Sequence, residues 1–265
     1  MILSDYHVHT NFCDGKSTPE EIIQAALKLN MQDLGFSGHS HVKFDEESCM
    51  SINGTENYKQ AVNNLKIKYD DKLRILLGVE QDYYSDLKPD GYDYVIASVH
   101  TLFVNDNKNF FHVDYSPEML CDAAQKYFDN DFYKLAELYY KHESDLLNKI
   151  KFKNKNIIIG HFDLITKYNE DFKLFNEDDK RYIDAAFNAL DELLKFDCIF
   201  EINTGAISRG YRTSPYPSVK ILQRIAEKGG RVILSSDSHH ASTLCFKFNE
   251  CEELAKSLGL ELVKL

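Results

Sequence analysis

Short apolar segments rich in β-branched residues alternate along the chain with longer segments in which apolar residues recur every three or four positions. The short segments predict strands and the long segments predict helices. Such regular alternation is typical of parallel β/α construction. The predicted strands span residues 2–8, 33–38, 74–80, 92–99, 156–160, 198–203 and 231–236. Because seven strands come close to the eight of a standard (β/α) barrel, the pattern predicts an α/β barrel fold.

The predicted helices between these strands have recognisable boundaries and faces. Thr18, Pro19 and Glu21 supply an N-cap, a first-turn proline and a capping-box acid at the start of the first helix. Within 132–147 and 182–194, apolar residues follow one helical face. We expect these helices to pack around the outside of the barrel.

The segment 102–116 has no clear period and is long for a connection between a strand and a helix. It could form a lid over a site at the barrel mouth, or a plain surface insertion. No internal repeat, low-complexity tract or linker rich in glycine, serine and proline divides the chain. The sequence therefore predicts a single domain spanning residues 1–265.

Composition restricts the partners and the compartment. The chain has 31 basic and 42 acidic residues and a net charge of −11, which disfavours nucleic acid and anionic membranes as partners. The six cysteines are scattered without a C-x-x-C pair, which favours reduced thiols. No apolar run approaches the ~20 residues of a membrane span, and the N-terminal segment lacks the features of a signal peptide. We expect a cytoplasmic protein.

Potential metal ligands gather where the predicted strands end. They are His7, His9, Asp14, His39, Glu80, His100, His161, Asp237 and His239. The C-terminal ends of the strands form the active face of a (β/α) barrel. Any one of these residues alone could equally hydrogen-bond a backbone carbonyl, but the whole set at one face indicates a metal centre.

The spacing of these residues supports the metal centre. His7 and His9 lie two apart on a strand, so both imidazoles can point to one face and reach one ion. Asp237 and His239 have the same spacing. Glu80 follows an apolar run and would be an uncompensated charge unless it met a cation, so we expect it to bridge two metal ions.

Four histidines lie outside this set. His142 falls on the apolar face of its predicted helix and is expected to be packed there. His41 and His240 adjoin predicted ligands and could contact the substrate or support a ligand. His112, in the 102–116 segment, could belong to the site or to the surface.

The motifs HVH, GH, GVE, SVH, GHFD and SDSH occur in this order between Asp5 and His239, and this order resembles the polymerase-and-histidinol-phosphatase (PHP) family. The resemblance implies a distorted seven-stranded (β/α) barrel with three divalent metal ions. The implied ligands are His7, His9, Glu80 and Asp237 for the first ion, Glu80, His100 and His161 for the second, and Asp14, His39 and His239 for the third. Some members have histidine in place of Asp14, so zinc, manganese and iron stay open.

Within that family, the segment FEINTGAISRGYRTSPYPSVKIL resembles the signature of the monofunctional histidinol-phosphatases. The resemblance implies a small phosphorylated substrate, L-histidinol phosphate. One departure is the SGHS motif, in which the residue before His39 is not the commoner acid. The surroundings of His39 are therefore left open.

Two of the six arginines, Arg209 and Arg212, lie in this same segment. Guanidinium groups suit phosphate oxygens, although each of the two could equally be a solvated surface residue. We take Arg209 as the first candidate. The hypothesis for the reaction is attack on phosphorus by a hydroxide that bridges two metal ions, with Asp237, His239 or a metal-bound water donating the proton to the leaving alcohol.

Three alternatives use the same residues. A PHP phosphodiesterase or exonuclease would act on nucleic acid, against which the acidic charge argues. A non-catalytic metal-binding barrel would leave unexplained a metal centre with room for water. A metal-dependent amidohydrolase would need fewer ligands than this chain offers.

Overall fold

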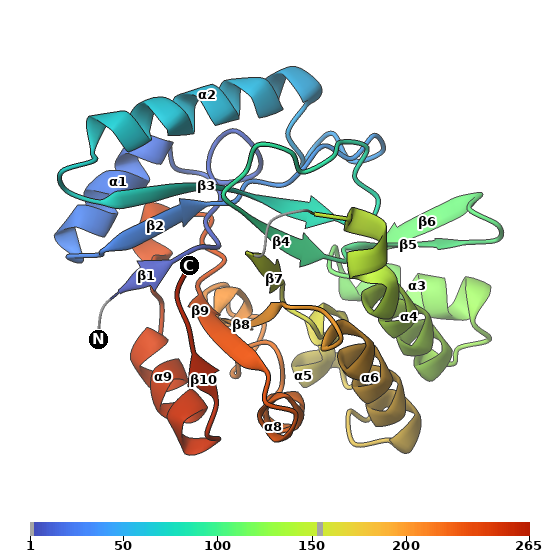
Figure 1. The fold of residues 1–265 in the computed structure, drawn as a ribbon. Coiled ribbons are helices and arrows are strands. Elements are labelled where there is room, and N and C mark those ends of the chain that lie inside the picture. Colours follow the sequence, from blue (N-terminus) through green and yellow to red (C-terminus); the bar gives the residue numbers. More distant parts are fainter. Residues whose placement is uncertain (1–2, 153–155) are drawn as a thin grey trace.

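The computed structural model describes residues 3–152 and 156–265. Eight parallel strands form one curled sheet in the order β1-β2-β3-β4-β7-β8-β9-β10 (Figure 1). These strands are β1 (Ser4–Asp5), β2 (Asp33–Phe36), β3 (Arg74–Asp82), β4 (Tyr94–Ser98), β7 (Ile157–Ile159), β8 (Ile199–Asn203), β9 (Arg231–Ser235) and β10 (Glu261–Leu262). The predicted barrel fold is confirmed, since each of the seven predicted segments overlaps one of these strands. Ile2, the first residue of the predicted 2–8 segment, lies outside the described residues.

The sheet closes differently at its two ends. At the C-terminal end of the strands, the chain after β1 bridges to the chain after β9, where the amide of His9 donates to the carbonyl of Ser238 at 2.8 Å. At the opposite end, β10 pairs with the start of β9 through Glu261 and Arg231. This eighth strand was not predicted, because two residues carry no periodicity. The barrel is therefore distorted, as the family resemblance implied.

Strand alternation separates an apolar floor from a polar mouth inside the barrel. The floor consists of Tyr6, Leu76, Tyr94, Ile96, Ile158, Ile199 and Ile233. On β3, Glu80 lies four residues beyond Leu76 and therefore on the same face, nearer the mouth. On β8, Glu201 lies two residues beyond Ile199 and therefore also on the same face, nearer the mouth. Gly78 makes room for the floor, because a Cβ there would lie 2.1 Å from the ring of Tyr94.

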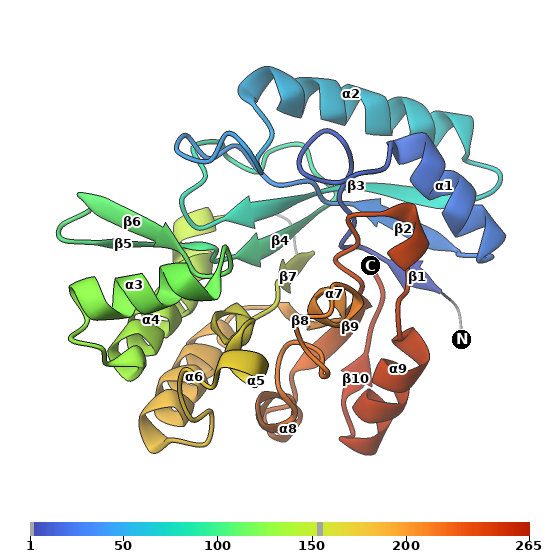
Figure 2. The ribbon, with the colours of Figure 1, turned by 180° about the vertical axis from the view of Figure 1, so that it is seen from behind.

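The helices pack outside the sheet. They are α1 (Pro19–Lys28), α2 (Ile52–Lys68), α3 (Pro117–Tyr127), α4 (Phe132–Ile150), α5 (Asn169–Phe172), α6 (Lys180–Leu193), α7 (Gly205–Ser208), α8 (Val219–Glu227) and α9 (Phe248–Ser257), with short 3-10 turns at η1 (Leu164–Thr166) and η2 (Ala241–Thr243). Figures 1 and 2 show α1 and α2 outside one part of the curled sheet, and α8 and α9 outside the opposite part.

The predicted start of α1 is confirmed, since the side chains of Thr18 and Glu21 each accept a hydrogen bond from the other's backbone amide. All six cysteines are free thiols. Among the described residues, no helix combines the length and apolar character that crossing a membrane requires.

The segment 102–116 contains an antiparallel hairpin of β5 (Thr101–Val104) and β6 (Asn109–His112), which projects past the ends of β3 and β4 (Figure 1). These strands escaped prediction, although the intervening N-D-N, with three consecutive positive φ values, is a turn sequence. The hairpin is held to the loop after β2 by aromatic rings: Phe44 lies 4.7 Å from Phe110 and 5.1 Å from Phe103 between ring centroids.

Candidate metal centre and its cleft

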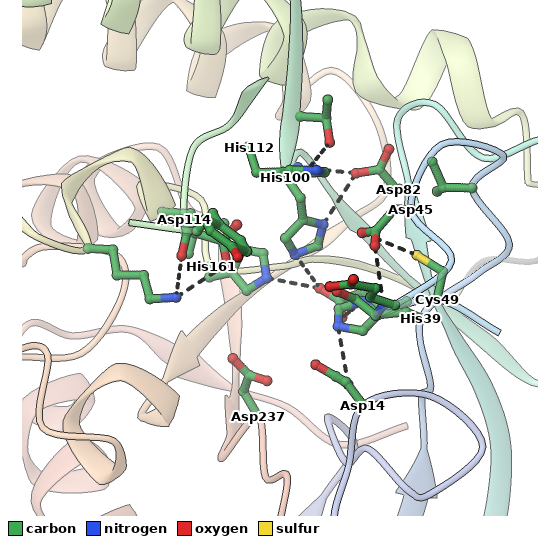
Figure 3. Close-up of a pocket in the computed structure, with 18 of the residues that line it drawn as sticks. Asp14, His39, Asp45, Cys49, Asp82, His100, His112, Asp114, His161 and Asp237 are labelled. Atoms are coloured by element: carbon green, nitrogen blue, oxygen red, sulfur yellow. Dashed lines mark hydrogen bonds and ion pairs between the residues drawn. The ribbon is translucent and has the colours of Figure 1, made fainter. Parts of the chain in front are cut away.

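A cleft of about 590 Å³ opens at the C-terminal ends of the strands. Its lining includes seven of the nine predicted ligands: Asp14, His39, Glu80, His100, His161, Asp237 and His239. Figure 3 shows five of these side chains converging from different elements. The remaining two, His7 and His9, are fully buried beneath the cleft, within reach of Glu80. The structure thus gathers all nine residues at one place.

Glu80 is the centre of this cluster. Its Oε2 atom lies 3.1 Å from Nε2 of His7, 3.4 Å from Nε2 of His9 and 3.0 Å from Nδ1 of His39. Its Oε1 atom lies 2.9 Å from Nε2 of His161 and 3.3 Å from Nε2 of His100. One carboxylate therefore presents an oxygen to each of two groups of imidazoles.

Two further carboxylates, those of Asp14 and Asp237, lie close to histidines of the cluster. Oδ2 of Asp14 lies 3.2 Å from Nε2 of His239, and its Oδ1 lies 3.7 Å from Nε2 of His39. Oδ1 of Asp237 lies 3.3 Å from Nε2 of His9 and 3.7 Å from Nε2 of His7. Nδ1 of His9 lies 3.7 Å from Oδ1 of Asp14, so His9 and His39 each belong to two groups of possible ligands, whereas the family resemblance assigned each to one ion.

The chemistry of these donors fits divalent cations. Nε2 of His7, Nε2 of His9, Oδ1 of Asp14 and Oε2 of Glu80 are buried and have no hydrogen-bond partner among the described residues. Buried polar atoms are rarely left unpaired in native proteins. Because imidazole nitrogens and carboxylate oxygens are the usual ligands of zinc and related metals, ions would satisfy all four atoms.

The electrostatic environment of the cluster also favours binding of cations. Burial lowers the pKa of the His7 imidazole, but the carboxylates of Glu201, Glu80 and Asp237 outweigh burial and raise it well above its usual value. Burial opposes ionisation of the Glu80 carboxyl as well, yet the neighbouring imidazoles hold its pKa well below the usual range. By contrast, burial and the adjacent His239 and His39 lower the pKa of His9 to about 3, so this ring keeps a free lone pair at neutral pH.

Two supporting carboxylates were missed from the sequence. Oε1 of Glu201 lies 2.6 Å from Nδ1 of His7, so the imidazole donates there and turns its Nε2 lone pair toward the cluster. Oδ2 of Asp82 lies 3.2 Å from Nδ1 of His100 and orients that ring in the same way. Glu201 had a detectable signal, because it is an acidic residue inside an otherwise apolar predicted strand.

Among the residues that the structure describes, Arg209 is the one arginine that lines the cleft. Its Nη2 atom donates to Oδ2 of Asp237 at 2.9 Å, and its Nη1 donates to the Asp237 backbone carbonyl at 2.8 Å. Lys167 lines the same cleft and donates to the carbonyl of Asp114. These two cations stand beside the predicted metal ligands, where a phosphate could meet them.

The other three candidates for substrate contact, Arg212, His41 and His240, are not among the described residues that line the cleft. Arg212 is buried and its guanidinium donates to Thr166 and Ser214, because the loop folds it against η1. Nδ1 of His41 lies 3.1 Å from the carbonyl of Met50. His240 is exposed and caps η2.

The two remaining histidines are also placed. His142 packs on α4 as predicted, with Nδ1 2.9 Å from the Leu138 carbonyl and Nε2 2.7 Å from the Tyr84 hydroxyl. His112 lines the cleft from the β5–β6 hairpin, 3.0 Å from the hydroxyl of Thr101. The hairpin is therefore a wall of the cleft.

Comparison with known proteins agrees with this geometry. Residues 5–205 match the family described as PHP domain. A protein from Schizosaccharomyces pombe named "Probable histidinol-phosphatase" is 28% identical over 262 residues, covering 90% of this chain and 81% of that protein. The histidinol-phosphatase of Lactococcus lactis is 25% identical over 269 residues, covering 96% of this chain and 91% of that protein.

A solved structure shares the fold over nearly the full length of both chains. It is the histidinol phosphate phosphatase of Lactococcus lactis complexed with zinc, L-histidinol and phosphate. Its TM-score is 0.73 at 22% identity, and the match covers 99% of this chain and 95% of that chain.

Proposed function

Because this chain belongs to the PHP domain family, we propose that it is a metal-dependent phosphomonoesterase that hydrolyses L-histidinol phosphate to L-histidinol and phosphate. The observation that carries the proposal is the set of buried, unpartnered ligand atoms around Glu80, at the base of a cleft that Arg209 lines. The names of two relatives and the ligands of the related structure support the choice of substrate.

The proposed cofactor is a set of three divalent ions, drawn from zinc, manganese and iron. Three groups of side chains support that number: His7, His9 and Glu80; His39, Glu80 and His100; and His9, Asp14, His39 and His239. Such ions, when bound, supply an activated water and withdraw charge from phosphoryl oxygens.

The chain's own residues would bind and orient the substrate. Arg209 offers guanidinium protons to the phosphoryl oxygens while Asp237 fixes its position through two hydrogen bonds. Asp237 and His239 are the proposed protein groups for proton transfer to the leaving alcohol, since both lie beside Arg209. His7 and His9 are fully buried at the base of the cleft, so bulk water does not reach the cluster from that side.

The cleft suits a small phosphomonoester. Its volume falls within the range of small-molecule sites, roughly 300–1,000 Å³. Its walls carry Phe44 and Phe110 together with Asp45 and Asp114. Aromatic and acidic side chains complement a leaving group that contains an imidazole and an ammonium.

The test is phosphate release from L-histidinol phosphate by protein whose metal content is measured in parallel. We expect kcat/KM for this substrate to exceed that for p-nitrophenyl phosphate by orders of magnitude, and chelation to remove the activity. Single-stranded DNA serves as a third substrate. Turnover of DNA alone, or of the generic ester alone, would contradict the proposed substrate while leaving the metal centre intact.

A further inference from the structure

The cleft contains a buried hydroxyl that the proposed chemistry leaves unused. Tyr216 is 1% exposed and lines the cleft, and its hydroxyl has no hydrogen-bond partner among residues 3–152 and 156–265. A phenolic hydroxyl can donate one hydrogen bond and accept others. Buried hydroxyls in native proteins are normally paired with protein, water or ligand. A water molecule or a ligand in the cleft would satisfy this hydroxyl.

The backbone of Tyr216 is fixed at the mouth of the barrel. Its carbonyl accepts from the amide of Asn203 at 2.7 Å, and its amide donates to the carbonyl of Asn203 at 2.9 Å. Asn203 is the last residue of β8, the strand that also carries Glu201. The tyrosine is thus attached to the same rigid strand as the carboxylate that orients His7.

Neighbouring side chains fix the ring as well. The guanidinium of Arg212 lies 5.2 Å from the ring centroid. The imidazole of His161 lies 6.4 Å away in an edge-on arrangement, with 74° between the ring planes. The ring is therefore packed beside one cation and one predicted metal ligand.

The surroundings of the hydroxyl suit an anionic oxygen. Arg209 and Lys167 line the same cleft as Tyr216 and His161. Burial raises the pKa of the Tyr216 phenol well above its usual value; the charges of Arg212 and Arg209 lower this pKa, and the carboxylates of Asp163 and Asp114 raise it. The phenol is therefore neutral at physiological pH and acts as a donor. A neutral donor next to two cations forms a charge-assisted hydrogen bond to an anion.

We propose that the hydroxyl of Tyr216 donates a hydrogen bond to a non-bridging phosphoryl oxygen of the substrate. Tyr216 is then a catalytic residue that acts beside Arg209. The inference rests on the proposed function, since it places the phosphoryl group between Arg209 and His161. The hydrogen bond strengthens as negative charge develops on the phosphoryl oxygens, so it lowers the barrier as well as holding the ground state.

The experiment compares Tyr216→Phe with Tyr58→Phe in metal-loaded protein. Tyr58 is also fully buried, but its hydroxyl donates to the carbonyl of Gly78 at 2.8 Å and it does not line the cleft. Three quantities are measured for each variant: kcat/KM for L-histidinol phosphate, the dissociation constant of inorganic phosphate from thermal shifts, and Tm without phosphate. Because the chain has no tryptophan, a near-ultraviolet difference spectrum on phosphate binding also reports tyrosine alone.

We expect Y216F to lower kcat/KM by about 100-fold and to weaken phosphate binding by roughly 10-fold. We also expect it to abolish part of the phosphate-induced spectrum, while Tm without phosphate stays at or above the wild-type value. Y58F should instead lower Tm and leave the kinetics and phosphate binding unchanged.

Wild-type phosphate affinity and kcat/KM in Y216F would overturn the inference. A fall in the phosphate-free Tm as large as that of Y58F would also overturn it, because the hydroxyl would then have a protein partner. If the wild-type protein hydrolyses no phosphomonoester but Y216F still weakens phosphate binding, the proposed function is wrong. The hydrogen bond from Tyr216 to phosphate is then still supported.

Discussion

Nδ1 of His7 lies 2.6 Å from Oε1 of Glu201, and both side chains are completely buried. The same carboxylate accepts through Oε2 from the backbone amide of His161 and from the side-chain amide of Asn203. Glu201 therefore connects the chain after β1, the chain after β7 and the end of β8. It orients one predicted ligand while holding the strand end that carries another.

We expect Glu201→Gln to lower metal affinity by about 10- to 100-fold, because glutamine has one acceptor oxygen, whereas the two oxygens of Glu201 accept from His7, His161 and Asn203. Competition with a chelator of known affinity measures this change. Glu192→Gln, at an exposed position paired with Lys195, is the control and should bind metal as the wild type does. Equal metal affinity in both variants would mean that Glu201 has only a packing role.

Replacing His7 and His9 by alanine should abolish turnover together with bound metal. Both Nε2 atoms are buried and unpartnered, so no other role accounts for them. Metal content per chain and phosphate release are measured on the same sample. His240→Ala, which removes an exposed histidine outside the cleft lining, should retain both properties. Full activity in the double variant would exclude the assigned centre.

Substitution of the two loop arginines should affect two different properties, kcat/KM in one variant and the free energy of unfolding in the other. Arg209→Ala should reduce kcat/KM by about 100-fold, since it removes a preorganised donor from the cleft. Arg212→Ala should lower the free energy of unfolding by about 2–3 kcal/mol, since it removes buried charged hydrogen bonds to Thr166 and Ser214. Urea unfolding and steady-state kinetics are compared for both variants. A larger kinetic loss in R212A than in R209A would reverse these assignments.

His142 should make the protein less stable in mild acid. Burial lowers the pKa of this imidazole from its ordinary value of 6.5, so the unfolded chain binds more protons than the folded one below that pH. Stability is therefore lost as pH falls from 6.5. Free energies of unfolding at about pH 7.5 and about pH 5.5 test this. His142→Gln should show a smaller decrease than the wild type, and an equal decrease would contradict the prediction.

Most of the metal centre was predictable because a barrel imposes a simple rule. Polar residues that follow apolar strands, such as Glu80 after 74–79, are delivered to one mouth whatever the details of packing. Glu201 follows the same rule, since it lies near the end of an apolar strand, on the same face as Ile199.

The substrate contacts were less predictable, because they depend on how a loop folds rather than on strand alternation. Arg209 and Arg212 are three residues apart in sequence, yet one lines the cleft and the other packs against η1. Unsatisfied groups such as the Tyr216 hydroxyl become visible only when the surrounding atoms are placed. The β5–β6 hairpin was missed because the apolar residues of segment 102–116 follow no clear period.

The aromatic contacts between Phe44 and the β5–β6 hairpin connect two walls of the cleft that arise from different β/α units. A change in length or bulk in one wall displaces the rings that support the other. We therefore expect these two segments to evolve together. When a relative acquires a different leaving group, substitutions in the loop after β2 should be accompanied by substitutions in the hairpin. Grafting either segment alone from a relative would leave the cleft with mismatched walls, whereas exchanging both as a pair preserves their packing.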